Sequence, residues 1–189
     1  AKLRAEENLR GVLSRWLART PVEEGFPDRY LDAFDRYVEE QRALHRENEQ
    51  LTGEERGRVQ ARLDAYREDC REFLAGEDAA VHAACLFIQA HREAPLLHWP
   101  NRLLESLLEF EEWLRLWRFR HARMVERMIG LRVGTGGSSG VGYLDATAGE
   151  RYRIFRVILR SRSFLIPRRL LGGLLEPARY GFVSEAGRA

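Results

Sequence analysis

The chain has 189 residues, 44% of them hydrophobic and 32% charged, which is enough apolar material for one core under a charged surface. Its formal net charge of +2 is too small to favour a nucleic-acid partner. No apolar run reaches the ~18 residues that span a bilayer, no signal peptide opens the chain, and Cys70 and Cys85 lack CxxC spacing, so we expect a reduced, cytoplasmic protein.

Apolar side chains at three- and four-residue steps predict helices over residues 2–18, 28–50 and 53–75. Asp28 is the expected N-cap of the second helix, and Thr52, followed by acidic residues, that of the third. The second and third helices carry thin apolar stripes between dense charges, so we predict that they form an antiparallel helical hairpin over 28–75. Such a hairpin also suits a subunit contact.

The second half of the chain continues the helical pattern. A strongly apolar helix is predicted over 78–92, a turn between Pro95 and Pro100, the longest helix over 101–130 with Gly130 as its C-cap, and a sixth helix over 148–162. Residues 172–189 read as a flexible tail. No stretch alternates like a strand. The sequence therefore predicts a single all-α domain over 1–189, a helical bundle of long antiparallel helices.

One histidine stands out within the longest predicted helix. His121 follows Trp117 by four residues and Trp113 by eight, and it precedes Val125 by four, so all four share one helix face, which we expect to look inward. A neutral imidazole there suits a metal or a haem iron. On spacing alone, a core histidine that is hydrogen-bonded to a neighbour is the more frequent outcome.

A glycine-rich run, Gly-Thr-Gly-Gly-Ser-Ser-Gly over 134–140, separates the last two predicted helices. It lacks the lysine of a P-loop, because Val141 follows its last glycine, and it lacks the preceding strand of a dinucleotide-binding turn. Its backbone N–H groups and three hydroxyls suit a small polar ligand such as an amino-acid head group. A flexible linker is the alternative.

Other polar residues give weaker signals. His82, His91 and His98 are nine and seven residues apart, so they do not form the i, i+4 pair of a zinc helix. Glutamates 109, 111 and 112 flank the aromatic stripe, and we expect them on a solvated face. No order of nucleophile, base and acid stands out.

Several of these motifs together resemble one known family. They are Leu-Trp-Arg-Phe-Arg-His over 116–121, Val-Glu-Arg-Met-Ile-Gly over 125–130, the glycine-rich run with Tyr143-Leu144 after it, and the continuations 151–155 and 164–168. The combination resembles the C-terminal signature of tryptophan 2,3-dioxygenases. The resemblance is specific over about 113–168 and looser over about 1–112.

The resemblance implies a haem-dependent dioxygenase that cleaves the indole C2–C3 bond of L-tryptophan with O₂ to give N-formylkynurenine. His121 would be the proximal ligand of haem b iron, with Trp117 and Val125 as further cofactor-binding residues. Thr135, with Gly134 and Gly136, would bind the ammonium and carboxylate end of the substrate. Residues 101–147 would thus hold the haem-ligand helix and the active-site loop. The family also implies a homo-oligomer, a tetramer or a dimer.

Two motifs of the family do not occur in this sequence: a distal-histidine motif and a segment with a carboxylate-binding arginine, both N-terminal in the family. The chain therefore resembles the C-terminal two-thirds of a family member. Two alternatives stay open: a related haem-dependent oxygenase or hydroxylase of another aromatic substrate, and a haem-binding protein without catalytic activity.

Overall fold

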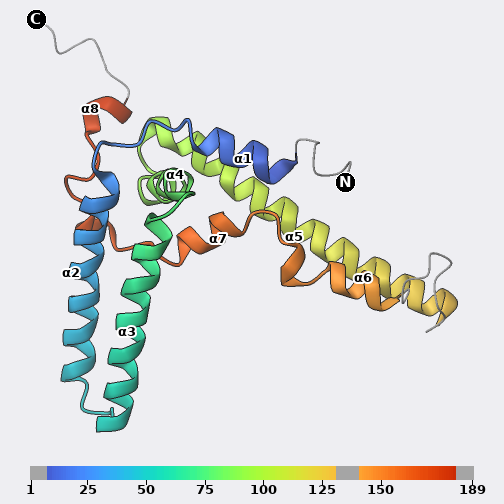
Figure 1. Cartoon of the computed structure of the whole chain (residues 1–189), viewed down its shortest axis with the longest axis horizontal. Coiled ribbons are helices and arrows are strands. Elements are labelled where there is room, and N and C mark those ends of the chain that lie inside the picture. The colour runs from blue at the N-terminus through green and yellow to red at the C-terminus, as the bar shows by residue number, and fades with distance from the viewer. Residues whose placement is uncertain (1–7, 131–140, 182–189) are drawn as a thin grey trace, which may run out of the picture. The chain divides into compact units, whose positions relative to one another are not determined.

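The computed structural model describes residues 8–130 and 141–181, and for Ala178 its backbone only. These residues contain helices and no strand, so the predicted all-α class is confirmed (Figure 1). The elements are α1 (Leu9–Leu17), α2 (Phe26–Glu47), α3 (Gly53–Leu74), α4 (Ala79–Ala90), α5 (Pro95–Ile129), α6 (Val141–Thr147), η2 (Glu150–Tyr152), α7 (Arg156–Arg162), η3 (Arg168–Leu170) and α8 (Pro177–Tyr180). No helix among the described residues has the length and apolar content needed to cross a membrane.

The chain groups into two compact units, one of residues 1–101 with 157–189 and one of residues 102–156. In the first unit the core is built around α4, which is buried along most of its length. Aromatic rings from three helices meet there: Phe26 of α2 lies 5.0 Å from Phe87 of α4, and Phe73 of α3 lies 5.0 Å from Phe164. The Tyr30 hydroxyl donates to the Phe164 carbonyl over 2.8 Å, which satisfies a polar group inside this core.

Helices α2 and α3 run side by side as the predicted hairpin (Figure 1). Thr52 caps α3 as expected, through a capping box in which Thr52 and Glu55 satisfy each other's backbone N–H groups. The start of α2 differs from the prediction: Gly25, with φ of +65°, is the N-cap, and Asp28 lies in the first turn. Glycine reaches this left-handed conformation without steric cost, and Pro27 suits the first helical turn.

Helix α5 begins earlier than predicted and has 35 residues. Pro95 and Pro100 were expected to bracket a turn, and this is wrong because Pro100 lies inside the helix. Pro100 is the sixth residue of the helix, beyond the N–H groups that lack a partner, so its ring removes one intrahelical bond, to the Leu96 carbonyl. Leu97 and Leu104, on either side of Pro100, are buried, and their packing holds this turn in place.

The C-terminal part also departs from the prediction. The sixth helix expected over 148–162 is divided into η2 and α7, with extended residues between them. The tail expected to be flexible from Gly172 is ordered up to residue 181, because Leu174 and Tyr180 are buried and the Tyr180 hydroxyl donates to the Pro21 carbonyl. Residues 182–189 lie outside the described part of the chain.

Candidate functional site on helix α5

The predicted cofactor-binding residues lie on one face of α5. At 100° per residue, the steps of three and four between positions 110, 113, 117, 121, 124 and 128 place these side chains in one stripe. The stripe holds His121 and five large apolar side chains: Phe110, Trp113, Trp117, Met124 and Met128. It extends over about 27 Å of helix, from the rise of ~1.5 Å per residue. We call it the His121 stripe.

The inward orientation predicted for this face is wrong for its aromatic residues. Trp113 is 68% exposed and Trp117 59%, and Phe119 beside the stripe is 50% exposed, so none of them is a core residue. His121 itself is half-buried. A row of uncovered tryptophan and methionine side chains of this length is unusual on a soluble surface and marks a binding face.

The adjoining face of α5 is covered by the returning segment of the same unit. Arg118 donates to the Thr147 carbonyl over 3.1 Å, and Arg115 to the Ala148 carbonyl over 3.2 Å. Arg123 pairs with Asp145 of α6. These bonds hold residues 141–155 on the buried side of Ala122 and leave the His121 stripe without cover from this segment.

Glu111 also attaches this returning segment to α5. We had expected this residue on a solvated face, and it is buried instead. The residue is 4% exposed, and its carboxylate accepts hydrogen bonds from the backbone N–H groups of Ile154 and Phe155, the latter over 3.1 Å. The two N–H groups lie just before α7, where a helix leaves donors unpaired, so the carboxylate acts as a remote cap. The sequence contains only a weak signal for the buried position of Glu111: it lies one helical turn before Arg115, which is on the covered face.

The imidazole of His121 has no hydrogen-bond partner among the described residues. Its closest aromatic neighbour is Trp117, with ring centroids 5.3 Å apart and an interplanar angle of 40°. The described residues therefore do not supply the hydrogen-bonded neighbour that a core histidine would have. The described residues contain no cluster of three or more histidine, cysteine or acidic side chains for a metal ion. A haem needs only one histidine from this side, and the free imidazole within flat apolar side chains fits such a group.

Val125 lies one turn after His121 and is partly buried, and Trp117 lies one turn before it; that these three residues bind a cofactor stays a prediction. The predicted substrate residues Thr135, Gly134 and Gly136 lie in 131–140, outside the described residues. Both flanks of that segment belong to the unit of His121. Gly130 ends α5 in the left-handed region with φ of +63°, as its C-cap role requires, and Val141 begins α6 as a buried residue.

Comparison with known proteins places this helix in a family. The family model described as tryptophan 2,3-dioxygenase matches residues 3–165, which include α5 and both of its flanks. The chain belongs to the tryptophan 2,3-dioxygenase family. The match also includes α1 to α4, the part of the chain in which the sequence resemblance was looser.

Individual relatives agree with this family. Tryptophan 2,3-dioxygenase 2 of Ralstonia nicotianae is 41% identical over 199 residues, and a tryptophan 2,3-dioxygenase-like protein of Xanthomonas campestris pv. campestris is 42% identical over 188. The alignments include 95% and 90% of this chain. They span 54% of the Ralstonia protein and 69% of the Xanthomonas protein, so the chain has about half to two-thirds of the length of these family members.

Proposed function

We propose that this chain carries the haem-ligand helix and the substrate loop of a tryptophan 2,3-dioxygenase. The reaction would be the O₂-dependent cleavage of the indole C2–C3 bond of L-tryptophan to N-formylkynurenine. The family match supports this reaction. One structural observation connects the reaction to particular residues: His121 is half-buried, has no hydrogen-bond partner among the described residues, and lies in an exposed stripe of tryptophan and methionine side chains.

The residues of α5 would hold the cofactor. His121 would ligate the iron of haem b, and Trp117 and Val125 would contact the macrocycle. When bound, the haem would supply the activation of O₂, and the protein would supply orientation and a site without bulk water. Water around the cofactor would be excluded by the other apolar side chains of the His121 stripe, among them Trp113, Met124 and Met128.

The glycine-rich loop would hold the substrate. The Thr135 hydroxyl would bind the charged head group of tryptophan, and Gly134 and Gly136 would let the backbone approach it closely. The partners are thus a small amino-acid substrate and O₂. We also propose a cytoplasmic homo-oligomer; both cysteines are buried and free, which is compatible with a reducing compartment.

Thr135→Ala tests the loop. We expect weaker tryptophan binding by about 1–3 kcal/mol, the usual cost of leaving a charged partner short of a hydrogen bond. A rise of KM with little change in kcat would be measured by steady-state assay. Ser138→Ala, in the same run, is the matched control and should change KM less. Equal KM values for wild type and Thr135→Ala would remove the threonine from the substrate site.

The reaction itself is tested on the full chain reconstituted with haem. Incubation with tryptophan and O₂ should yield N-formylkynurenine, and tyrosine should yield no product. A hydroxylated product from either amino acid would identify the related oxygenase instead. The name of the Xanthomonas relative, a tryptophan 2,3-dioxygenase-like protein, is compatible with this alternative. Haem retention without any turnover would identify a haem-binding protein.

A further inference from the structure

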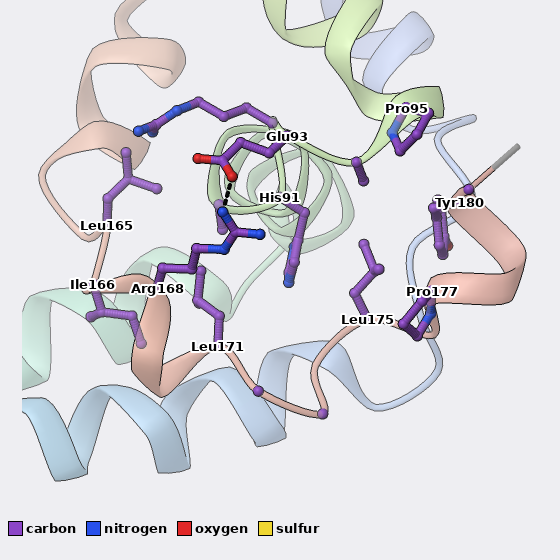
Figure 2. A pocket seen from close by; sticks show the side chains of 16 residues that line it. His91, Glu93, Pro95, Leu165, Ile166, Arg168, Leu171, Leu175, Pro177 and Tyr180 are labelled. Atoms are coloured by element: carbon purple, nitrogen blue, oxygen red, sulfur yellow. Dashed lines mark hydrogen bonds and ion pairs between the residues drawn. The ribbon is translucent and has the colours of Figure 1, made fainter.

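A separate cavity of about 500 Å³ lies in the first unit, between the end of α4 and the C-terminal segment of the chain (Figure 2). None of the residues assigned above to haem or substrate lines it. One wall is formed by residues 90–95, which lead from α4 into α5, and the opposite wall by residues between 165 and 181. A volume of this size lies in the range of sites for small organic molecules.

Both walls of this cavity supply apolar surface. The lining includes a set of aliphatic and proline side chains: Leu165, Ile166, Leu171, Leu175, Pro95 and Pro177 (Figure 2). Tyr180 adds an aromatic ring, and its hydroxyl is already occupied because it donates to the Pro21 carbonyl. The rings of proline and tyrosine present flat apolar faces, which suit a planar aromatic body.

The charged residues of the lining do not balance one another. Arg168 donates to the Glu93 carboxylate, so these two charges form a pair. Arg92 also lines the cavity, is exposed, and has no hydrogen-bond or ion-pair partner among the described residues. His91 adds no charge at neutral pH, because burial lowers its pKa. The cavity therefore has one cation in excess, the guanidinium of Arg92.

The helix ends at this wall do not change that balance. Ala90 ends α4 and Pro95 begins α5, so a helix C-terminus and a helix N-terminus meet within the same short connection. The first carries a partial negative charge and the second a partial positive charge, and the two offset each other. Arg92 is thus the feature that sets the sign of a ligand's charge.

We propose that the cavity binds an aromatic monocarboxylate, a planar apolar molecule with one negative charge. The aromatic body lies against Leu171 and Leu175, and the carboxylate pairs with Arg92 at the edge. An inorganic anion would leave the apolar lining uncovered. A single excess cation favours one negative charge over two.

The test uses the full chain without added haem, so that binding of a carboxylate to iron cannot contribute. Calorimetric titration at pH 7 and low ionic strength compares 2-naphthoate with 2-naphthamide, which has the same rings and nearly the same shape but no charge. We expect 2-naphthoate to bind at one site and the amide about fivefold more weakly, a modest ratio because Arg92 is exposed to solvent. Equal affinities, or no binding of 2-naphthoate, would overturn the proposal.

Three variants assign the charge preference to this edge. Arg92→Gln should bind the two probes equally. Arg62→Gln, at an exposed arginine of α3 that does not line the cavity, should keep the wild-type preference. Glu93→Gln releases Arg168 as a second cation, so 2-naphthoate should bind about threefold more tightly than to wild type. An undiminished preference in Arg92→Gln, or weaker binding of 2-naphthoate in Glu93→Gln, would contradict the pairing at this edge.

A fourth variant assigns the aromatic body to the cavity. Leu175→Trp fills the space beside Leu171 and should abolish binding of both probes, while a helical circular-dichroism spectrum like that of wild type shows that the chain is folded. Unchanged 2-naphthoate binding in folded Leu175→Trp would place the ligand elsewhere and overturn the proposal.

Discussion

The residues around His121 leave its imidazole nitrogens available to a ligand. Trp117 is one turn before it and Val125 one turn after it, and no described side chain bonds its ring nitrogens. An unsatisfied imidazole that is only half-buried costs little in the isolated chain, since water can reach it. Under the proposed function, the same imidazole would ligate the iron once an apolar cofactor covered the stripe.

Glu111 is a buried charged residue of α5, and we expect its substitution to lower stability. Its buried carboxylate accepts two backbone N–H groups, so Glu111→Gln replaces charge-assisted hydrogen bonds by weaker ones. We predict that the free energy of unfolding falls by about 1–2 kcal/mol, measured by urea titration. Glu112→Gln, at the exposed neighbouring position, is the control and should change it by less than about 0.5 kcal/mol.

At the residue level, the specific motif gave the cofactor-site residues, whose role stays a prediction, and periodicity alone misjudged which face of α5 is covered. The Trp-Arg-Phe-Arg-His motif selected His121, and the structure places Trp117 and Val125 beside it. Periodicity also predicted that the tryptophans face a core. A helix of this composition has two apolar faces, and spacing does not say which of them the chain itself covers. The buried role of Glu111 was missed for the same reason.

Among the elements, the α2–α3 hairpin is joined in part by one shared carboxylate. Asp35 of α2 accepts two hydrogen bonds from Arg67, over 2.6 and 2.5 Å, and one from Arg71 over 3.0 Å, both from α3. The hydrogen bonds from Arg67, and then the charges of the two arginines, hold the pKa of Asp35 below its ordinary value. The hairpin is therefore joined by a charged cluster that also sets its register.

This cluster predicts an acid-dependent loss of stability. A lowered pKa means that Asp35 stabilises the fold above the pKa of about 3.9 of an unfolded aspartate, and that this contribution is lost as the pH falls through the lower folded value. Urea unfolding between pH 2 and 6 should show a steeper loss for wild type than for Asp35→Asn. Asp32→Asn, at an exposed position on α2, should keep the wild-type slope. Parallel curves for Asp35→Asn and wild type would contradict the assignment.

The helices themselves were largely predictable, and their boundaries less so. Thr52 and Gly130 were identified correctly because capping chemistry is local. Pro100 was misjudged because burial of the flanking Leu97 and Leu104 outweighs the local preference of proline. The split between η2 and α7 depends on Glu111, which is about forty residues away in sequence, and no local pattern contains that information.

For the molecule as a whole, the charged hairpin is the part we expect to mediate assembly. Leu44, near the free end of α2, is 61% exposed, although most apolar side chains of the hairpin are at least partly buried. We predict a homo-oligomer, and that Leu44→Glu lowers its mass in static light scattering. Arg62→Glu, an exposed change on α3, should leave the mass unchanged. A monomeric wild-type chain would remove the hairpin from any role in assembly.

The central claim is that the imidazole of His121 bonds haem iron, and haem titration followed in the Soret band tests it most directly. The full chain should bind one haem with a Soret band typical of histidine ligation. His98→Ala, which removes an exposed histidine from the same helix, should titrate like wild type, and His121→Ala should lose stable binding. The same Soret band and the same affinity in His121→Ala would contradict the account.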